Sequence, residues 1–429
     1  MLQALFNPRT LLCLLVVVNS GFIFLTDNKL AGLPYLRELF LAGVVGAAVL
    51  LLAMWQRPWQ SKASLWILFM GVVLPVLSAL LAWYHFDQPL LYGLLEERRN
   101  FLYLLFFPAL YLMLRAQPTQ EQLERYFLIG GLACVAVGFL YYFKVIPENA
   151  AVAFNVDEKD YGLNPLRPDR FSIGGAYVSL CAMMLMYRLR RRIELVPVLL
   201  LTLFAAYLWL VLQTRNTMLV CALAGLWIFR AHLHVLFKLG LAIIVVGGIA
   251  YMVMPDPFEA QYERLMALVA EAAEPGGVRA DTTAIILRDT AANWYVGMGA
   301  LSLQWQGGFA SLYSSYFYLS DVGVLGVMYR YGFIMPLIVL VYFVGFWRIS
   351  RQCRNKGDLL AAFTLDMCFN LINLFLSPAM MYEGNITALA IAAFVYYGQV
   401  RVPASQPQPA DRPLARPAGP AGLLVSSGR

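Results

Sequence analysis

The sequence predicts an all-α polytopic membrane protein with about 12 transmembrane helices and a large helical loop on the outer side of the membrane. Three observations favour this class. The mean hydropathy is +0.66. Charged residues make up 13% of the chain, whereas soluble domains contain roughly a quarter. The apolar residues also fall in blocks of about 18 to 22, the length that an α-helix needs to cross a hydrocarbon core of roughly 30 Å.

Twelve such blocks follow one another along the chain. The first has a short preceding segment and no clear small-residue cleavage site, so it is interpreted as an uncleaved signal anchor. The blocks lie near 10–27, 34–55, 64–84, 100–115, 126–143, 171–188, 194–213, 216–231, 236–254, 322–347, 358–377 and 383–400.

The basic residues predict which side faces the cytoplasm, because cytoplasmic loops carry an excess of Lys and Arg. If the N-terminus is cytoplasmic and the spans alternate, 19 of the 32 basic residues fall on the inner side. An even number of spans then places both termini in the cytoplasm, as in a multi-pass protein of the bacterial inner membrane. The net charge of +7 follows from this bias and indicates no nucleic-acid partner.

The expected organisation has four parts. Residues 1–254 form spans 1 to 9, with a polar outer loop at 144–170. Residues 255–321 form a periplasmic loop rich in aromatic residues, in which the patterns PDPFEAQYERLMALVAEAAEPGG and VRADTTAIILRDTAANW predict two helices. Residues 322–400 form spans 10 to 12. The tail 401–429 is rich in Pro, Ala and Arg, which predicts a disordered cytoplasmic segment.

Two arginines stand out at the predicted outer side. Arg215 opens the eighth span in LQTRNTMLV, where the free amides of a helix N-terminus also favour anions. The alternative is an interfacial arginine that reaches out of the membrane. Arg288 lies in the second predicted loop helix, where the alternative is an ordinary helix charge paired with Asp281 or Asp289.

Further arginines lie near the same outer mouth. Arg330 is expected to point into the bundle, because on a helix Gly323, Gly326 and Arg330 fall within about 60° of one another at 100° per residue. Its expected roles are a functional intramembrane cation or a structural ion pair with Glu38 or Asp366. The remaining arginines of this mouth are Arg170, Arg98, Arg99 and Arg37, with Glu96 and Glu97 available to neutralise Arg98 and Arg99.

The outer side lacks the residues of several chemistries. No HExxH, GxSxG, Walker A, DxD or CxxC pattern occurs there, and all six cysteines fall in spans or on the inner side. Neither a disulfide framework nor a metal site is therefore expected. Arginines and carboxylates remain, and these suit a diphosphate held by guanidinium groups, with a carboxylate as general base. No cofactor is expected.

These residues resemble the O-antigen ligase and O-antigen polymerase superfamily of bacterial envelope glycosyltransferases. The resemblance covers most of the chain and rests on the order of four motifs within twelve spans. In the outer loop, Arg288, Trp294, the turn Gly297-x-Gly299 and then Asp321 follow the order seen in that superfamily. The motifs are RFSIGGAY, TRNTMLV, LRDTAANWYVGMGALS and YFYLSDVGVLGVMYRYG.

The resemblance implies a GT-C-like fold and a metal-independent reaction in which undecaprenyl-diphosphate-linked saccharides are joined on the periplasmic face. Arg215 and Arg288 would grip the donor diphosphate, and the other outer arginines would position the second lipid-linked substrate. The base would be one of three carboxylates, and a single displacement would invert the anomeric centre. Flippase and chain-length regulator proteins would be partners. The candidate bases are Asp289, Asp321 and Glu383.

Three alternatives are considered beside this function. The ligase branch, which transfers the polysaccharide to lipid A-core, typically has a histidine in the large loop, and no histidine lies between 255 and 321. That departure favours a polymerase of O-antigen or exopolysaccharide repeat units. Twelve spans also describe secondary transporters and lipid-saccharide flippases, although those need no aromatic outer domain of this size. An inactive scaffold in an envelope assembly is the third alternative.

Overall fold

The computed structural model describes residues 7–23, 36–54, 61–146, 170–171, 173–231, 278–302, 304–306, 308–313, 317, 319, 322–375 and 379–399, with isolated residues between 237 and 266. Every regular element within these ranges is helical. One isolated antiparallel bridge joins Val296 to Gly332. The predicted all-α class is therefore confirmed.

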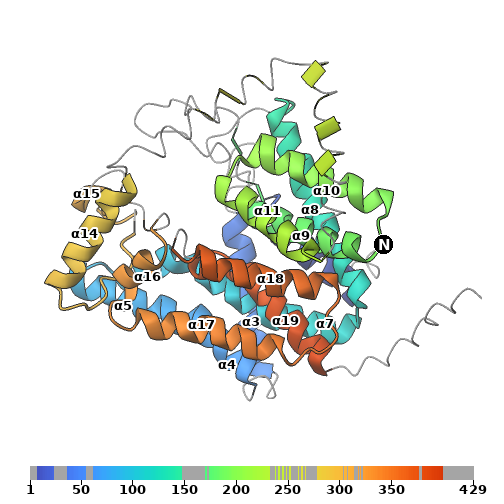
Figure 1. The fold of residues 1–429 in the computed structure, drawn as a ribbon. Coiled ribbons are helices and arrows are strands. Elements are labelled where there is room, and N and C mark those ends of the chain that lie inside the picture. Colours follow the sequence, from blue (N-terminus) through green and yellow to red (C-terminus); the bar gives the residue numbers. More distant parts are fainter. Residues whose placement is uncertain are drawn as a thin grey trace, which may run out of the picture.

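The helices form an elongated bundle with a cap of short helices at one end (Figure 1). Those of the first half are α2 (Pro8–Asn19), α3 (Leu36–Met54), α4 (Lys62–Leu68), η2 (Phe69–Val73), α5 (Leu74–Phe86), α6 (Leu90–Glu96), η3 (Glu97–Leu105), α7 (Phe106–Ala116) and α8 (Gln120–Tyr142). Those of the second half are α9 (Gly175–Arg191), α10 (Leu195–Tyr207), η4 (Leu208–Leu212), α11 (Arg215–Phe229), α14 (Val278–Ala292), α15 (Phe309–Leu312), α16 (Val324–Tyr331), α17 (Met335–Ser350), α18 (Asp358–Asn373), η6 (Ala379–Met381) and α19 (Gly384–Gln399).

Four helical stretches are long and apolar enough to cross a membrane. Three further helices are apolar but shorter: α2, α11 and α17. A protein that lies in a membrane is thus supported by length and composition, and the number of twelve spans stays a prediction. The predicted span 236–254 lies mostly outside the described residues. The four long stretches are Leu36–Met54, Lys62–Phe86, Gln120–Tyr142 and Leu195–Leu212.

Hydrogen bonds join helix ends that are far apart in the sequence. At one end, Arg9 Nε donates to the carbonyl of Ala116 at 3.3 Å and Tyr397 Oη donates to that of Pro118 at 3.2 Å. At the opposite end, Asn385 Nδ2 donates to the carbonyl of Asn19 at 3.3 Å. The first group joins ends that the topology assigns to the inner side, and the second joins predicted outer ends. We refer below to the inner end and the outer end of the bundle in this sense.

Two predicted spans differ from continuous α-helices. The span predicted at 100–115 begins as the 3₁₀-helix η3, nine residues long, although such runs seldom exceed four residues. The span predicted at 322–347 is interrupted at Gly332, which has φ +62° and ends α16 before α17 begins. The prediction of a single continuous helix there is therefore wrong, because the positive φ of Gly332 breaks the helical hydrogen-bond pattern.

The described part of the large outer loop has a small core of its own. Its second predicted helix is confirmed as α14, whereas the first, between 255 and 277, lies mostly outside the described residues. Buried apolar side chains of the loop pack on one another and on α16, at the left of Figure 1. This packing explains the aromatic content of the loop. The core residues are Ile286, Met298, Phe317, Leu319, Val322 and Tyr329.

An extended segment, residues 296–302, holds this loop against the bundle. Gln88 Nε2 donates to the carbonyl of Ala300 at 3.2 Å, and Gln88 Oε1 accepts from the amide of Ser302 at 2.7 Å. Gly299 has φ +75°, and a Cβ there would overlap the backbone of Ser78 and Ala82 in α5. The Gly-x-Gly turn in the sequence thus allows the backbone to lie directly on α5.

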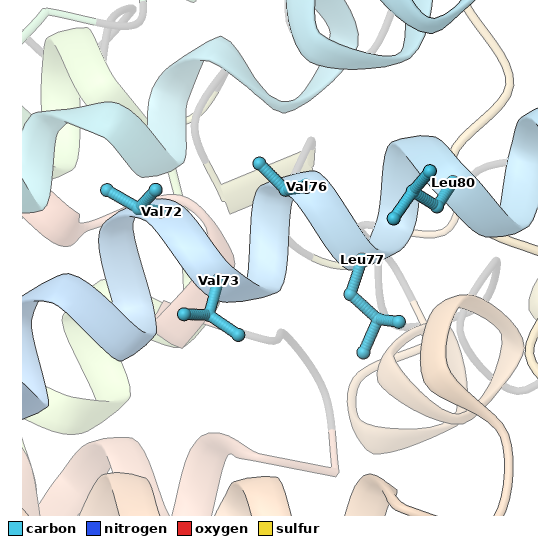
Figure 2. A pocket seen from close by; sticks show the side chains of 5 residues that line it. All are labelled: Val72, Val73, Val76, Leu77 and Leu80. Carbon is cyan, nitrogen blue, oxygen red and sulfur yellow. The ribbon is translucent and has the colours of Figure 1, made fainter.

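One side of the long stretch Lys62–Phe86 carries only aliphatic side chains along part of its length. Figure 2 shows a shallow groove on η2 and α5 that is lined only by aliphatic side chains. Such a surface suits contact with hydrocarbon and offers no group for chemistry. The lining residues are Val72, Val73, Val76, Leu77 and Leu80.

We expect the substitution Gly299→Ala to destabilise the protein by about 2 kcal/mol or more, because it adds a Cβ against backbone atoms at a positive φ. The measurement is the thermal midpoint of the purified protein in detergent. Gly43→Ala in α3 is the matched control, since a Cβ at Gly43 meets nothing within 4 Å. Equal midpoints for Gly299→Ala and Gly43→Ala would contradict this account of the turn.

Candidate functional site

The candidate site is built on the 3₁₀-helix η3, in which every third side chain is buried. In a 3₁₀-helix, side chains three residues apart lie above one another. Glu97, Asn100 and Tyr103 form such a row, and each is 2% exposed or less. Tyr103 Oη donates to the carbonyl of Met380 at 2.7 Å. This bond fixes η3 to the segment that leads into α19.

The buried row carries a carboxylate that binds a buried arginine from another helix. Arg330 Nη1 in α16 donates to both oxygens of Glu97, at 2.9 and 3.0 Å. Ser78 Oγ in α5 and Asn100 Nδ2 also donate to this carboxylate, each at 2.6 Å. The side chains of Arg330 and Glu97 are 8% and 1% exposed. A buried ion pair with added hydrogen bonds of this kind joins three elements.

The predicted orientation of Arg330 is confirmed, and its predicted partners are wrong. Arg330 points into the bundle and pairs with Glu97. Glu38 instead lies 4.0 Å from Arg98. Asp366 accepts a hydrogen bond from Asn370 at 3.3 Å, one turn along α18. The partner of Arg330 lies on a different helix from both residues that were expected.

Tyr382 lies between two guanidinium groups at the start of α19. Its ring centroid is 5.9 Å from Arg330 Cζ and 5.8 Å from Arg99 Cζ. Arg330 Nη2 also donates to the Tyr382 hydroxyl at 3.3 Å. Since Arg330 is fixed by Glu97, the ring it holds is a fixed surface for Arg99. Cation–π contacts of this kind are worth about 0.5–1 kcal/mol at exposed sites.

Arg99 is the cation of this group with the fewest protein partners. Its side chain is exposed, and within the described part of the chain no oxygen atom hydrogen-bonds to it and no carboxylate forms an ion pair with it. Arg98, by contrast, donates from Nη1 to the carbonyl of Leu95 at 2.8 Å and lies beside Glu38. Arg99 therefore retains most of its five N–H donors for a ligand.

Glu96 lies next to these arginines and is half-buried. Burial raises the pKa of its carboxyl, while the nearby charges of Arg330, Arg98 and Arg99 act to lower it and that of Glu97 acts to raise it further. No hydrogen bond to the Glu96 carboxylate occurs among the described residues. We call Arg98, Arg99 and Arg330, together with Glu96, Glu97 and Tyr382, the outer arginine cluster.

Arg170 and Arg215 form a second group at the outer end. The backbone amide of Phe171 donates to the carbonyl of Val211 at 2.9 Å. Arg170 donates from Nε to the carbonyl of Leu212 at 3.3 Å and from Nη2 to Thr214 Oγ1 at 3.4 Å. Arg215 follows Thr214 as the first residue of α11 and is half-buried. The structure thus brings Arg170 to the N-terminus of the helix that Arg215 begins.

Arg288 lies on α14 (Figure 1), which packs against α16, the helix that carries Arg330. Its side chain is 69% exposed, and its Nε donates to Asp289 Oδ1 at 2.8 Å. This hydrogen bond is the largest cause that raises the Arg288 pKa. Asp289 also hydrogen-bonds with Tyr313, whose hydroxyl lies 2.7 Å from that of Tyr329. No contact between Arg288 and Arg215 occurs among the described residues.

The remaining predicted residues lie elsewhere. Glu383 is the residue before α19, and its carboxyl interacts with Asn370 of α18, beside Asp366. Arg37 lies in the first turn of α3. Asp321 lies outside the described residues. The sequence interpretation missed Glu97 and Tyr382 as organisers of the site, although the spacing of Glu97, Asn100 and Tyr103 already shows a period of three.

Within the described residues, no three His, Cys, Asp or Glu side chains gather in a way that could hold a metal ion. No family model, curated protein or solved structure matches the chain. The chemistry of the site is therefore interpreted from the side chains themselves.

The ion pair of Arg330 with Glu97 predicts a specific pattern of stability. We expect Arg330→Met to destabilise the protein by about 3–5 kcal/mol, because it leaves the Glu97 charge buried without its partner. The double variant Arg330→Met with Glu97→Leu is expected to recover most of this loss. The measurement is a double-mutant cycle of thermal midpoints in detergent.

Arg98→Met serves as the control for that cycle, since its 4.0 Å contact with Glu38 is about 40% exposed on both sides and is expected to contribute less than about 1 kcal/mol. Additive losses in the double variant would contradict the interpretation of a buried pair.

Proposed function

We propose that the protein is a membrane glycosyltransferase that joins undecaprenyl-diphosphate-linked oligosaccharide repeat units into a polysaccharide. The observation that carries this proposal is Arg99, an exposed guanidinium in a three-arginine cluster at the outer end, with no carboxylate bound to it among the described residues. A diphosphate offers the paired anionic oxygens that a planar guanidinium fork binds best. A membrane-embedded bundle suits a substrate that carries a long lipid chain.

Two arginines of the cluster have different proposed roles, Arg330 a structural one and Arg99 the binding of the ligand. Arg330 is saturated by Glu97 and Tyr382, so it holds the site together and has little capacity left for a ligand. Arg99 rests on the Tyr382 ring with its donors available. Its orientation is therefore fixed before a ligand binds, which reduces the entropy lost on binding. Arg215, at a helix N-terminus, adds a second cation where free backbone amides also favour an anion.

The proposed reaction is a single displacement. A hydroxyl oxygen of the acceptor saccharide gives its proton to a carboxylate and attacks the anomeric carbon of the donor, and a new glycosidic bond forms. The bond from that carbon to the diphosphate oxygen breaks, and its electron pair leaves with the diphosphate. Arg99 and Arg215 stabilise the charge that builds on the leaving group. The anomeric centre is inverted, and Arg98, Arg170, Arg37 and Arg288 remain as cations for the second lipid-linked substrate.

The resemblance to the O-antigen polymerase and ligase superfamily supports this proposal through its motifs. We propose, on the same resemblance, that the protein lies in a bacterial inner membrane with cytoplasmic termini and a GT-C-like arrangement. Its partners would include flippase and chain-length regulator proteins. A ligase that transfers the polysaccharide to lipid A-core would use the same diphosphate donor. The two differ in the acceptor, which is a second lipid-linked saccharide for the polymerase.

A transporter or flippase is the competing class, and one observation favours it. Asp366 and Glu383 lie on either side of Asn370 within the bundle. Ionisable residues inside a membrane protein often mark an ion pathway. The outer arginine cluster favours the transferase, because a mobile carrier gains nothing from an exposed cation fixed at one end. The two classes differ in their products, because only a transferase lengthens the saccharide.

Arg99→Ala is expected to weaken binding of undecaprenyl diphosphate to the purified protein about 10- to 100-fold, the loss of a charge-assisted hydrogen-bond pair. Arg99→Lys should bind with intermediate affinity, because an ammonium keeps the charge and loses the fork. Binding is measured by titration in detergent, with undecaprenyl monophosphate as the comparison ligand.

The matched control is Arg115→Ala. Arg115 is another exposed arginine, in the last turn of α7 at the inner end, and its Cζ lies 5.5 Å from the ring centroid of Tyr111. Arg115→Ala should bind as the wild type does. Wild-type affinity in Arg99→Ala would exclude Arg99 as the diphosphate ligand.

Single replacements of Arg215 and Arg288 by Ala or Lys distinguish the functions in a strain that lacks the chromosomal copy. A polymerase defect is expected to remove long polysaccharide and leave single repeats attached, whereas a ligase defect would remove all attached chains. We expect Arg215→Ala to show the polymerase pattern and Arg288→Ala to show a weaker one, since Arg288 is exposed and paired with Asp289. The readout is the polysaccharide profile on a gel at matched protein levels, and normal profiles from both alanine variants would refute their proposed role.

A further inference from the structure

Glu96 is the one carboxylate of the outer arginine cluster that the cluster itself does not use. The neighbouring Glu97 is 1% exposed and accepts hydrogen bonds from Ser78, Asn100 and Arg330. Glu96 is half-exposed, and no donor binds its carboxylate within the described part of the chain. Two adjacent glutamates thus have opposite environments, one closed by protein donors and one open to a ligand.

Glu96 lies close to Arg99 in space. It is the last residue of α6 and directly precedes η3, which carries Arg99 in its first turn. The charges of Glu96 and Arg99 act on one another, next to the buried row of Glu97, Asn100 and Tyr103. The carboxylate and the guanidinium therefore belong to the same part of the cluster.

We propose that Glu96 is the general base of the glycosyl transfer, taking the proton of the acceptor hydroxyl while Arg99 binds the diphosphate that leaves. This inference rests on the proposed function. In the step, the oxygen of the hydroxyl forms the bond to the anomeric carbon, and its O–H bond electrons stay on that oxygen. The proton passes to the Glu96 carboxylate, and the diphosphate departs with the electron pair of the broken bond.

The other described carboxylates are less suited to this role. Asp289 is engaged by Arg288 and Tyr313. Glu383 turns toward Asn370 and Asp366 in α18. Both oxygens of Glu97 already accept hydrogen bonds from Arg330, and Ser78 and Asn100 bind them as well, so neither is open to an acceptor hydroxyl. Glu96 lies near three guanidinium groups without a hydrogen bond from any of them among the described residues, and a base must reach its proton directly.

The electrostatic surroundings of Glu96 agree with this role. The charges that face it are those of Arg98, Arg99 and Glu97 on η3 and of Arg330 on α16. Burial is the largest effect and raises its pKa above the ordinary value of 4.5, toward the working pH at which a general base is most effective. A base acts only when it is deprotonated, so the rate should fall as the pH drops below this raised pKa.

The experiment uses purified full-length protein and a lipid extract of the deletion strain, which would accumulate the unpolymerised lipid-linked repeat. Lengthening of the saccharide is followed by mass spectrometry at pH values from about 4, near the ordinary pKa of a carboxyl group, to about 9. We expect Glu96→Gln to slow the transfer about 100-fold or more and to abolish the fall of the rate at low pH. Glu96→Asp should restore part of the rate and keep the pH dependence.

Two further measurements separate a base from a structural residue. Glu96→Gln should keep the thermal midpoint and bind undecaprenyl diphosphate as the wild type does, because Arg99 and Tyr382 are unchanged. Glu121→Gln, an exposed glutamate in the first turn of α8 at the inner end, is the matched control and should keep the wild-type rate.

The outcomes distinguish this inference from the function on which it rests. An active wild type with an equally active Glu96→Gln, or a Glu96→Gln variant that retains the fall at low pH, overturns the role of Glu96 and leaves the transferase intact. A wild-type protein that binds undecaprenyl diphosphate and lengthens no saccharide overturns the proposed function, and the role of Glu96 falls with it.

Discussion

The ion pair between Arg330 and Glu97 determines how the outer end of this bundle is built. Two charges that are removed from water cost several kcal/mol each unless their remaining donors and acceptors are also bonded. Here Ser78 of α5 and Asn100 of η3 complete the carboxylate, and Tyr382 before α19 binds the guanidinium. Four segments of the chain, α5, η3, α16 and the residues before α19, must therefore meet at one point. The loss of any one of them would leave a buried charge incompletely bonded.

The unusual backbone around this pair follows from the same requirement. A 3₁₀-helix brings Glu97, Asn100 and Tyr103 onto one face, whereas an α-helix, at about 100° per residue, would rotate the side chain by about 60° at each three-residue step. The break at Gly332 ends α16 just after Arg330, so this arginine lies in a short helix that packs on α5 and α14. The extended segment 296–302 then covers the pair, with the amide of Gly299 donating to the carbonyl of Arg330 at 3.1 Å. These features are local departures from regular helix at the place where chemistry is proposed, as is common at functional sites.

Composition and hydropathy are sufficient to predict the helical class, because a helix in an apolar environment depends on the content of long apolar blocks more than on particular side chains. The burial of Arg330 was also predictable, since Gly323, Gly326 and Arg330 share a face at helical spacing. Its partner was not, because Glu97 lies 233 residues away and local periodicity carries no information on such pairs. The 3₁₀-helix escaped prediction for a related reason. An apolar run with charges at its start has the same hydropathy in either helical form, and the burial of Glu97, Asn100 and Tyr103 is seen only in the structure.

The same limit explains why the sequence ranked the arginines differently. Arg288 was favoured by its place in a motif, yet its exposed side chain is paired with the next residue. Arg99 appeared neutralised by its glutamate neighbours, yet one of these belongs to Arg330, and Arg99 lies on the Tyr382 ring that Arg330 holds. Oppositely charged residues that are neighbours in the sequence need not form an ion pair, because a distant residue such as Arg330 can bind one of them instead. Because Glu97 is bound to Arg330, it does not pair with Arg99, and a structural ion pair thereby leaves a guanidinium and the Glu96 carboxylate beside it without hydrogen bonds from the described residues.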